Sequence, residues 1–306
     1  MSEPITNRPS LREQFPNPPA PILKESGNQL IGNIIADAIQ ENPTLSQVEP
    51  DKLQIAVKNA LTEIGTLEEL AKKHEQAFRV GQLPWPIETI RKIKTLWVLS
   101  GPGYYRQPFK EDRYKDVSWA KYMGRHRLTY AGLLMRKFAE AIAGIPSAAL
   151  STGKISPSIP ELRTLVATHS PFLLFNGRPD ENQDVMAILE TDNSIIPPVK
   201  VFISGERIDR TVDQVTNLEL PPTLKFQAGD EIGIITHAPH LMRFGHMLRY
   251  QQNELPFPPG VVIRALPLAS PSDGKTAYTE QEIRGLLYYV FITHQASEEN
   301  YHYKLD

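Results

Sequence analysis

Cysteine is absent from all 306 residues of the chain. This absence excludes disulfides, thiolate nucleophiles and zinc sites built from cysteine, and it is compatible with a reducing or an oxidising compartment. Long apolar runs are also absent, because no stretch approaches the ~20 residues of a membrane span. The proline-rich, polar N-terminus lacks the apolar core of a signal peptide. We therefore expect a cytoplasmic protein without a membrane span.

A marked excess of one charge is missing as well. Lys and Arg total 33 and Asp and Glu total 35, which gives a formal net charge of -2. Nucleic-acid-binding domains usually carry a basic excess, so we expect no nucleic-acid partner. The hydrophobic fraction of 41% and the charged fraction of 22% are those of an ordinary globular protein. The length suits one large α/β domain with a smaller helical region.

The first third of the chain divides into two parts. Residues 1–26 are proline-rich and polar, which predicts a disordered or extended arm. Apolar residues at helical spacing predict a helical extension over residues 27–90. Within it, Thr66-Leu-Glu-Glu69 has the pattern of a capping box that opens a third helix, and Gly81 would end that helix. The extension would either cap the rest of the chain or contact a partner protein through residues 27–80.

Residues 91–306 alternate strand-like and helix-like segments. The strand-like segments are short and uniformly apolar, which is typical of strands covered on both faces. They are Thr95–Ser100, Phe172–Phe175, Val199–Ser204, Ile232–Thr236 and Val261–Leu266. This alternation predicts an α/β fold with a Rossmann-like, mostly parallel sheet flanked by helices.

Helical patterns lie between these segments, at about 125–144, 180–191, 209–219 and 239–252. A last helix is expected to open at Thr279-Glu-Gln-Glu282, which has the pattern of a capping box. Residues 145–170 are dotted with proline and serine, so we expect an irregular loop there.

Ligands of such sheets bind beyond the carboxyl ends of the strands. The first strand is followed by Ser100-Gly-Pro-Gly103, in which Gly101 and Gly103 would let a ligand approach the backbone closely. The spacing of a dinucleotide fingerprint is incomplete, so a simple turn is an equally good interpretation.

The second strand is followed by Asn176-Gly-Arg-Pro-Asp-Glu181. Asn176 and Gly177 can turn the chain, while Arg178 and Glu181 offer opposite charges at the edge of the sheet. A capped helix with an ordinary surface ion pair would have the same sequence.

The third strand is followed by Glu206 and then by Arg210-Thr-Val-Asp-Gln214. Arg210, Asp213 and Gln214 would share one helical face at three- and four-residue spacing. Such a set is also typical of a solvated helix surface, so on its own it does not indicate a site.

The fourth strand ends in Thr236-His-Ala-Pro-His-Leu-Met-Arg243. Pro239 suits the first turn of a helix, and His240 and Arg243 would share a face at its positive end. His237 and His240 could bind a metal together with Glu206 or Asp213, but two histidines are incomplete on their own and nearby arginines would repel a cation. An anionic ligand fits better, and either histidine could instead be structural.

These strand-end motifs together resemble the SanA/ElyC/YdcF family of bacterial proteins, over residues 94–270. The matching elements are Val98-Leu-Ser-Gly101, Arg127, Phe175-Asn-Gly177 with Glu181, Glu206, Arg210-Thr-Val-Asp-Gln214 and Thr236-His-Ala-Pro-His-Leu-Met-Arg243. The resemblance implies a Rossmann-like fold and a link to cell-envelope integrity, with no settled reaction. Three residues depart from the family pattern: Asn176, Arg178 and Gln214.

We therefore expect a small anionic metabolite, containing phosphate or a nucleotide, at the carboxyl edge of the sheet. Arg243 and Arg127 would pair its charge, with His240 as general acid and Glu181, Glu206 or Asp213 as general base or hydroxyl ligand. The remaining ligand contacts would come from Gly101, Gly103, Asn176, Gly177, Arg178, Arg210, Thr211, Thr236 and His237. As an enzyme, the protein would be a hydrolase or transferase acting on a phosphorylated or sugar-linked, envelope-related precursor.

Two other functions are compatible with the same motifs. A non-catalytic sensor or scaffold would hold the ligand in this pocket and use its helical extension to contact a partner. A methyl-transfer cofactor would suit the glycines at 101 and 103, but no clear acidic partner for its ribose follows the next strand. The sequence therefore does not identify a cofactor.

Overall fold

The computed structural model describes residues 27–100, 123–145, 158–177, 179–190, 194–204, 208, 210–270 and 275–306. The predicted arm lies outside the described residues. So do four of the predicted site positions, which are Gly101, Gly103, Arg178 and Glu206.

Five strands form one parallel sheet in the order β3-β2-β1-β4-β5. They are β1 (Ile93–Leu99), β2 (Phe172–Asn176), β3 (Val201–Ile203), β4 (Glu231–His237) and β5 (Val262–Leu268). The five predicted segments correspond to these strands, and their ends agree within two residues. The predicted α/β, Rossmann-like fold is confirmed.

The order of the strands reverses at β1, which pairs with β2 on one side and β4 on the other. Leu99 lies opposite Asn176, and Val98 lies opposite Ile235. The carboxyl ends of these three strands therefore meet at one edge of the sheet. In open α/β sheets, ligands bind in the crevice at such a switch point.

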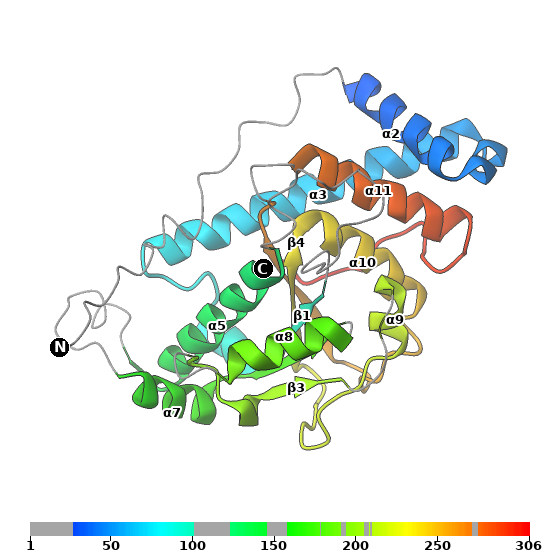
Figure 1. The fold of residues 1–306 in the computed structure, drawn as a ribbon. Coiled ribbons are helices and arrows are strands. Elements are labelled where there is room, and N and C mark those ends of the chain that lie inside the picture. The colour runs from blue at the N-terminus through cyan, green and yellow to red at the C-terminus, as the bar shows by residue number, and fades with distance from the viewer. Residues whose placement is uncertain are drawn as a thin grey trace, which may run out of the picture.

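Helices cover both faces of the sheet (Figure 1). One face carries α2 (Gly27–Glu41), α3 (Pro50–Arg79), α10 (Ala238–Tyr250) and α11 (Lys275–Phe291), and the other carries α5 (Met123–Ile142), α7 (Ile159–His169) and α8 (Pro179–Leu189). The short elements are η1 (Pro43–Gln47), α4 (Ile87–Lys92), η4 (Pro198–Lys200) and α9 (Thr211–Thr216). Helix α9 is shorter than the predicted 209–219.

Strand β1 shows why the strand segments are apolar throughout. Trp97 and Leu99 pack into the core that contains α2, α3, α10 and α11. Leu96 and Val98 pack into the second core, with α5, α7 and α8. Because successive side chains point to opposite faces and both faces are covered, every position of β1 except the partly exposed Lys94 is buried.

The helical extension shares the first of these cores. Leu53, Val57 and Ile64 of α3 are buried in it beside residues of α10 and α11. The predicted helix start at Thr66 is wrong, because α3 runs unbroken through this position and the Thr66 hydroxyl donates to the Thr62 carbonyl within the helix. The predicted stop is confirmed: Gly81 has a φ of 74°, which suits the residue just beyond a helix.

Two further boundaries differ from the prediction. Part of the expected loop 145–170 is helix α7, which opens with a capping box between Ser158 and Glu161. Pro160 lies in the first turn of α7, where proline is tolerated, so its presence did not indicate a loop. The capping box expected at Thr279 is also absent, because α11 already begins at Lys275.

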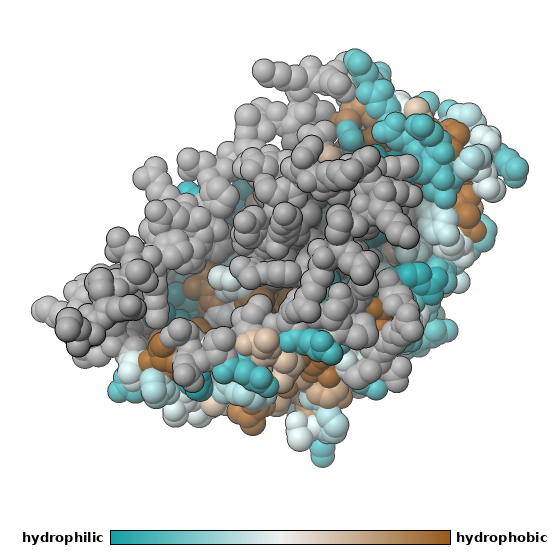
Figure 2. All heavy atoms as spheres, viewed as in Figure 1, coloured by the Kyte–Doolittle hydropathy of each residue, from teal (hydrophilic) through white to brown (hydrophobic). Residues whose placement is uncertain are grey.

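The surface mixes polar and apolar residues, as the coloured part of Figure 2 shows. The most exposed large hydrophobic residues are Ile55 in α3, Val80 at the C-cap of the same helix, and Val199 in η4. No helix in the described part of the chain has the length and apolar character needed to cross a bilayer.

Candidate functional site

The start of α10 lies at the switch point of the sheet. Strand β4 ends at His237 and α10 begins at the next residue, with Pro239 in its first turn as predicted. Thr236, His237 and His240 are all buried, with exposed fractions of 1% or less. Three of the predicted site residues therefore lie together behind the carboxyl edge of the sheet.

His240 contacts a carboxylate that the sequence did not assign to the site. Both carboxylate oxygens of Glu282, on α11, lie 3.2 Å from His240 Nδ1. Burial lowers the pKa of His240 to about 4; Glu282 opposes this shift, while Arg243 and Arg127 reinforce it. His240 is consequently neutral at neutral pH, which favours a proton acceptor over the predicted general acid.

Glu282 keeps its negative charge although it is buried. Burial by itself raises the pKa of this carboxyl group, but Arg243, His240 and Arg127 outweigh burial and hold the pKa at about 2. The shortest of these contacts joins Arg243 Nε to Glu282 Oε2, at 2.7 Å. A buried carboxylate surrounded by arginines is stable only in its ionised form.

Arg243 extends from α10 across the surface of α11. Its Nη2 donates to the Thr211 hydroxyl at the start of α9, over 3.0 Å, so two predicted ligand residues are in contact. The guanidinium lies 5.9 Å from the centre of the Tyr289 ring. At Gly285, a β-carbon would lie 2.6 Å from Arg243 Nη1, so any larger residue there would require the guanidinium to shift.

Arg127 comes from α5, on the other face of the sheet, and is 1% exposed. Its Nη1 donates to the carbonyl of Leu99 at the end of β1, over 2.8 Å, and its Nε donates to His237 Nδ1 over 3.3 Å. The guanidinium therefore bridges the two strands that flank the switch point. Burial raises the pKa of the neighbouring Tyr278 well above its usual value, so this phenol stays protonated.

We refer to Arg127, His240, Arg243 and Glu282 as the switch-point cluster. Three of the four were predicted as site residues, and Glu282 was missed. A local signal for Glu282 existed: it lies on α11 beside the buried Ile283, Leu286 and Leu287, where a carboxylate is unexpected. The capping-box pattern provided a local explanation for the same residue and concealed this signal.

Asn176 connects β1 and α9 to β2 through the oxygen and the nitrogen of its side-chain amide. Its Oδ1 accepts from Trp97 Nε1 and its Nδ2 donates to the Gln214 carbonyl, each over 2.7 Å. The Gln214 side chain in turn donates to the Ser100 hydroxyl. The polar groups of Asn176, predicted to bind ligand, are thus engaged in holding the ends of β1, β2 and α9 together.

The turn after β2 is tightly packed. Gly177 N–H donates to Asn182 Oδ1 over 3.0 Å. A β-carbon on Gly177 would lie 2.6 Å from the Phe175 ring and 3.0 Å from Glu181 Oε2. A side chain at position 177 would therefore force the Phe175 ring to shift, and the Glu181 carboxylate lies beside this glycine.

Arg210 and Asp213 form a local pair at the start of α9. The backbone N–H of Arg210 donates to Asp213 Oδ2 over 2.8 Å, and Arg210 Nη2 donates to Oδ1 over 3.0 Å. The Arg210 side chain is 56% exposed, whereas Gln214 is buried. The expectation that Arg210, Asp213 and Gln214 share one face is wrong, because Arg210 precedes the helix as its N-cap.

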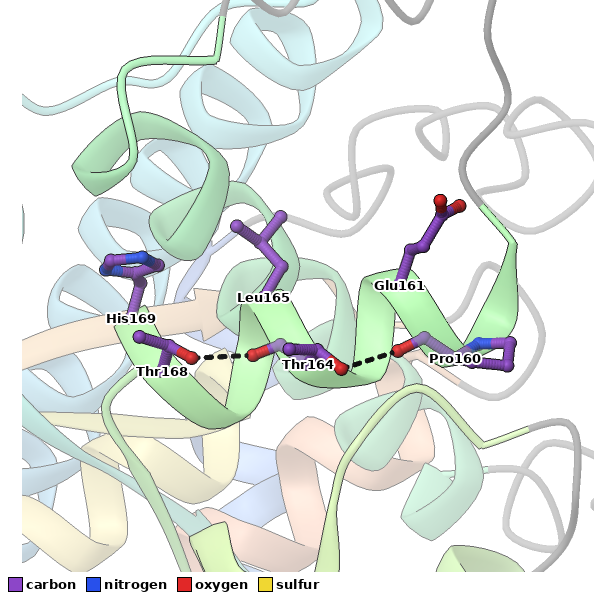
Figure 3. A pocket seen from close by; sticks show the side chains of 6 residues that line it. All are labelled: Pro160, Glu161, Thr164, Leu165, Thr168 and His169. Atoms are coloured by element: carbon purple, nitrogen blue, oxygen red, sulfur yellow. Dashed lines mark hydrogen bonds between the residues drawn. The ribbon is translucent and has the colours of Figure 1, made fainter.

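A metal centre and a surface hollow are two further candidates for a functional site. Within the described residues, no three His, Asp or Glu side chains are grouped so that they could hold a metal ion, and Glu206 lies outside this part of the chain. A surface hollow is lined by α7 alone, from Pro160 to His169 (Figure 3). Its two threonine hydroxyls donate to carbonyls of their own helix, so they do not converge on a ligand.

The chain matches no family model, no curated protein and no solved structure. The resemblance to the SanA/ElyC/YdcF family stays a prediction from the motifs.

Proposed function

We propose that the protein binds a small anionic metabolite, containing phosphate or a nucleotide, at the switch-point cluster. The observation that carries this proposal is the charge of the cluster. Arg127 and Arg243 contribute two positive charges, Glu282 contributes one negative charge, and His240 is neutral. The four groups therefore sum to +1 in a position where three of them are buried and Arg243 is partly buried, and an anion would be favoured there.

The position of the cluster supports the same ligand class. Backbone N–H groups at the start of α10 and the positive end of its dipole lie where β4 ends. Thr211, already in contact with Arg243, supplies a hydroxyl beside them. Guanidinium groups and N-terminal amides are the usual partners of phosphate oxygens.

A catalytic role is the second part of this proposal. A carboxylate that holds a neutral imidazole at Nδ1 is an arrangement suited to general-base catalysis. With the family resemblance, it supports a hydrolase or transferase acting on a phosphorylated or sugar-linked, envelope-related precursor. A His240→Ala variant that still binds ligand but loses turnover would support this enzyme.

The alternative is a non-catalytic sensor or scaffold that contacts a partner through residues 27–80. The apolar stripes of α2 and α3 are buried against α10 and α11, so such a partner would use their exposed faces. Binding of a ligand without turnover of any phosphorylated compound in a metabolite panel would favour the sensor.

Thermal unfolding in sodium phosphate tests anion binding. At a concentration one hundred times its dissociation constant, a ligand stabilises the folded state by about 2.7 kcal/mol. We expect phosphate to raise the melting temperature by several degrees more than sodium chloride of equal ionic strength. The Arg243→Met variant should lose this difference.

Arg249→Met is the matched control, because Arg249 lies on the same helix and pairs outside the cluster with Gln252 and Glu299. It should respond to phosphate as the unmodified protein does. Equal responses to phosphate and chloride in the unmodified protein would contradict the proposal.

A further inference from the structure

The protonation of His240 follows from its two neighbours at Nδ1. Glu282 is ionised and can only accept, and its two oxygens lie 3.2 Å from this nitrogen. Arg243 Nη2 also approaches Nδ1, at 3.3 Å, but it donates to the Thr211 hydroxyl over a shorter 3.0 Å. The proton of the neutral ring therefore resides on Nδ1, where it satisfies the carboxylate.

The other ring nitrogen, Nε2, then carries a lone pair and acts as an acceptor. This atom is buried, and within the described residues it has no hydrogen-bond partner. The Thr236 hydroxyl, at the end of β4, is likewise buried without a partner among these residues. A buried acceptor without a donor is costly, so Nε2 is expected to meet a donor when the site is filled.

An acceptor in a site with net positive charge places a specific demand on the ligand. The arginines require an oxyanion, and a fully deprotonated oxyanion offers Nε2 only acceptors. We propose that the switch-point cluster selects an oxyanion that brings its own O–H group, either on the phosphate itself or on a neighbouring carbon. This inference rests on the proposed anion site and specifies the ligand class that the site takes.

A comparison of inorganic phosphate with sulfate tests whether the O–H group lies on the phosphate itself. The two ions are similar in size and shape, but at neutral pH phosphate keeps a proton and sulfate has none. We expect isothermal titration at pH 7.5 to show phosphate binding at least about tenfold more tightly than sulfate, which corresponds to one buried hydrogen bond.

A comparison of glycerol 3-phosphate with propyl phosphate tests whether the O–H group lies on a neighbouring carbon. Above pH 7 both phosphate groups are largely dianionic, because their second pKa is about 6, and only glycerol phosphate has hydroxyls on its carbons. A preference of about tenfold for glycerol phosphate would place the donor on the organic part of the ligand.

Glu282→Gln tests whether His240 sets the preference. The amide can donate to Nδ1, which would move the ring proton to Nε2 and turn the acceptor into a donor. The preference for the ligand with the O–H group should fall to less than about threefold. Glu63→Gln is the matched control. Glu63, on α3, contacts His246, which lies on α10 as His240 does but outside the cluster. It should leave the preference unchanged.

The outcomes separate the two proposals. The inference is wrong if phosphate compounds bind but the protein prefers neither phosphate over sulfate nor glycerol 3-phosphate over propyl phosphate. It is also wrong if Glu282→Gln retains the full preference. In both cases anion binding stands. If none of the four probes binds, anion binding itself is wrong. If Glu282→Gln does not fold, the two ligand comparisons in the unmodified protein still test whether the site prefers an oxyanion with an O–H group.

Discussion

Helix α10 carries two buried histidines, and each contacts a glutamate from another helix. His240 faces Glu282 of α11, and His246 faces Glu63 of α3, with Nε2 3.1 Å from the carboxylate. At His246 the other ring nitrogen lies 2.8 Å from the carbonyl of Ser297. Both nitrogens of His246 therefore have acceptor partners, whereas His240 has a partner at Nδ1 alone among the described residues.

The two histidine–glutamate pairs therefore differ in how completely their polar atoms are hydrogen-bonded within the described residues. Glu63 Oε2 also accepts from Asn300 Nδ2 over 2.6 Å, so the His246 pair ties α3, α10 and the C-terminal segment together. The His240 pair lies beside two arginines, and its Nε2 has no hydrogen-bond partner in the described part of the chain. We interpret the first pair as structural and the second as the functional one.

The largest expected effect comes from removing the buried carboxylate. Glu282→Ala leaves the buried Arg127 and the partly buried Arg243 without their counter-charge, which should lower the free energy of unfolding by about 3–5 kcal/mol. Glu63→Ala removes the partly exposed partner of His246 and should cost only about 1 kcal/mol. Urea unfolding at pH 7 measures both variants, and equal losses would remove the distinction between the two pairs.

Acid should destabilise the protein through His240. Its pKa is about 4 in the folded state and 6.5 ordinarily, so between these values the unfolded chain binds the extra proton. Stability should therefore fall as the pH drops from 6.5 to 4, by roughly 3 kcal/mol for this residue.

His74, whose pKa burial and Arg264 also lower to about 4, adds a loss of the same sign. Urea unfolding between pH 7 and 4.5 measures the sum of the two contributions. His240→Gln and His74→Gln should each flatten the pH dependence. A His240→Gln variant with the full acid loss would show that His240 is not held neutral.

The smallest effects concern two helical glycines. Gly65 of α3 has open space where a β-carbon would be, so Gly65→Ala should raise stability by about 0.5–1 kcal/mol through helix propensity. Gly285→Ala would place its methyl group against the Arg243 guanidinium, and it should cost about 1–3 kcal/mol and weaken the response to phosphate. Thermal unfolding with and without phosphate checks both, and a stabilising Gly285→Ala would mean that Arg243 moves freely.

Most of the fold could be predicted because its signals are local. Each strand is short and mostly apolar, although β1 contains Lys94 and β5 contains Arg264. Gly81 ends α3 through its own backbone conformation. The errors arose where one local pattern suits two structures. Thr66 and Thr279 both begin capping-box patterns, yet both lie inside continuous helices whose burial outweighs that preference. Ser158 and Glu161 form a real capping box in a segment whose prolines suggested a loop.

The site was predictable only in part, for a related reason. His240 and Arg243 belong to the motif at the end of β4, where the parallel order of the sheet gathers polar residues. Arg127, on α5, was predicted through the family resemblance. Glu282 is 42 residues from His240 and is placed by the packing of α11 on α10. The structural roles of Asn176 and Gln214 also depend on partners from distant strands.

The amino-acid sequence by itself determined the five strands, their shared direction and the edge at which polar residues gather. The spacing of apolar residues indicates these features because it acts over a few neighbouring positions. Only the tertiary structure decided which ionisable groups meet and which protonation states they adopt. Charge and burial act through space, so the same imidazole is a neutral acceptor beside Glu282 and two arginines and a structural tie beside Glu63.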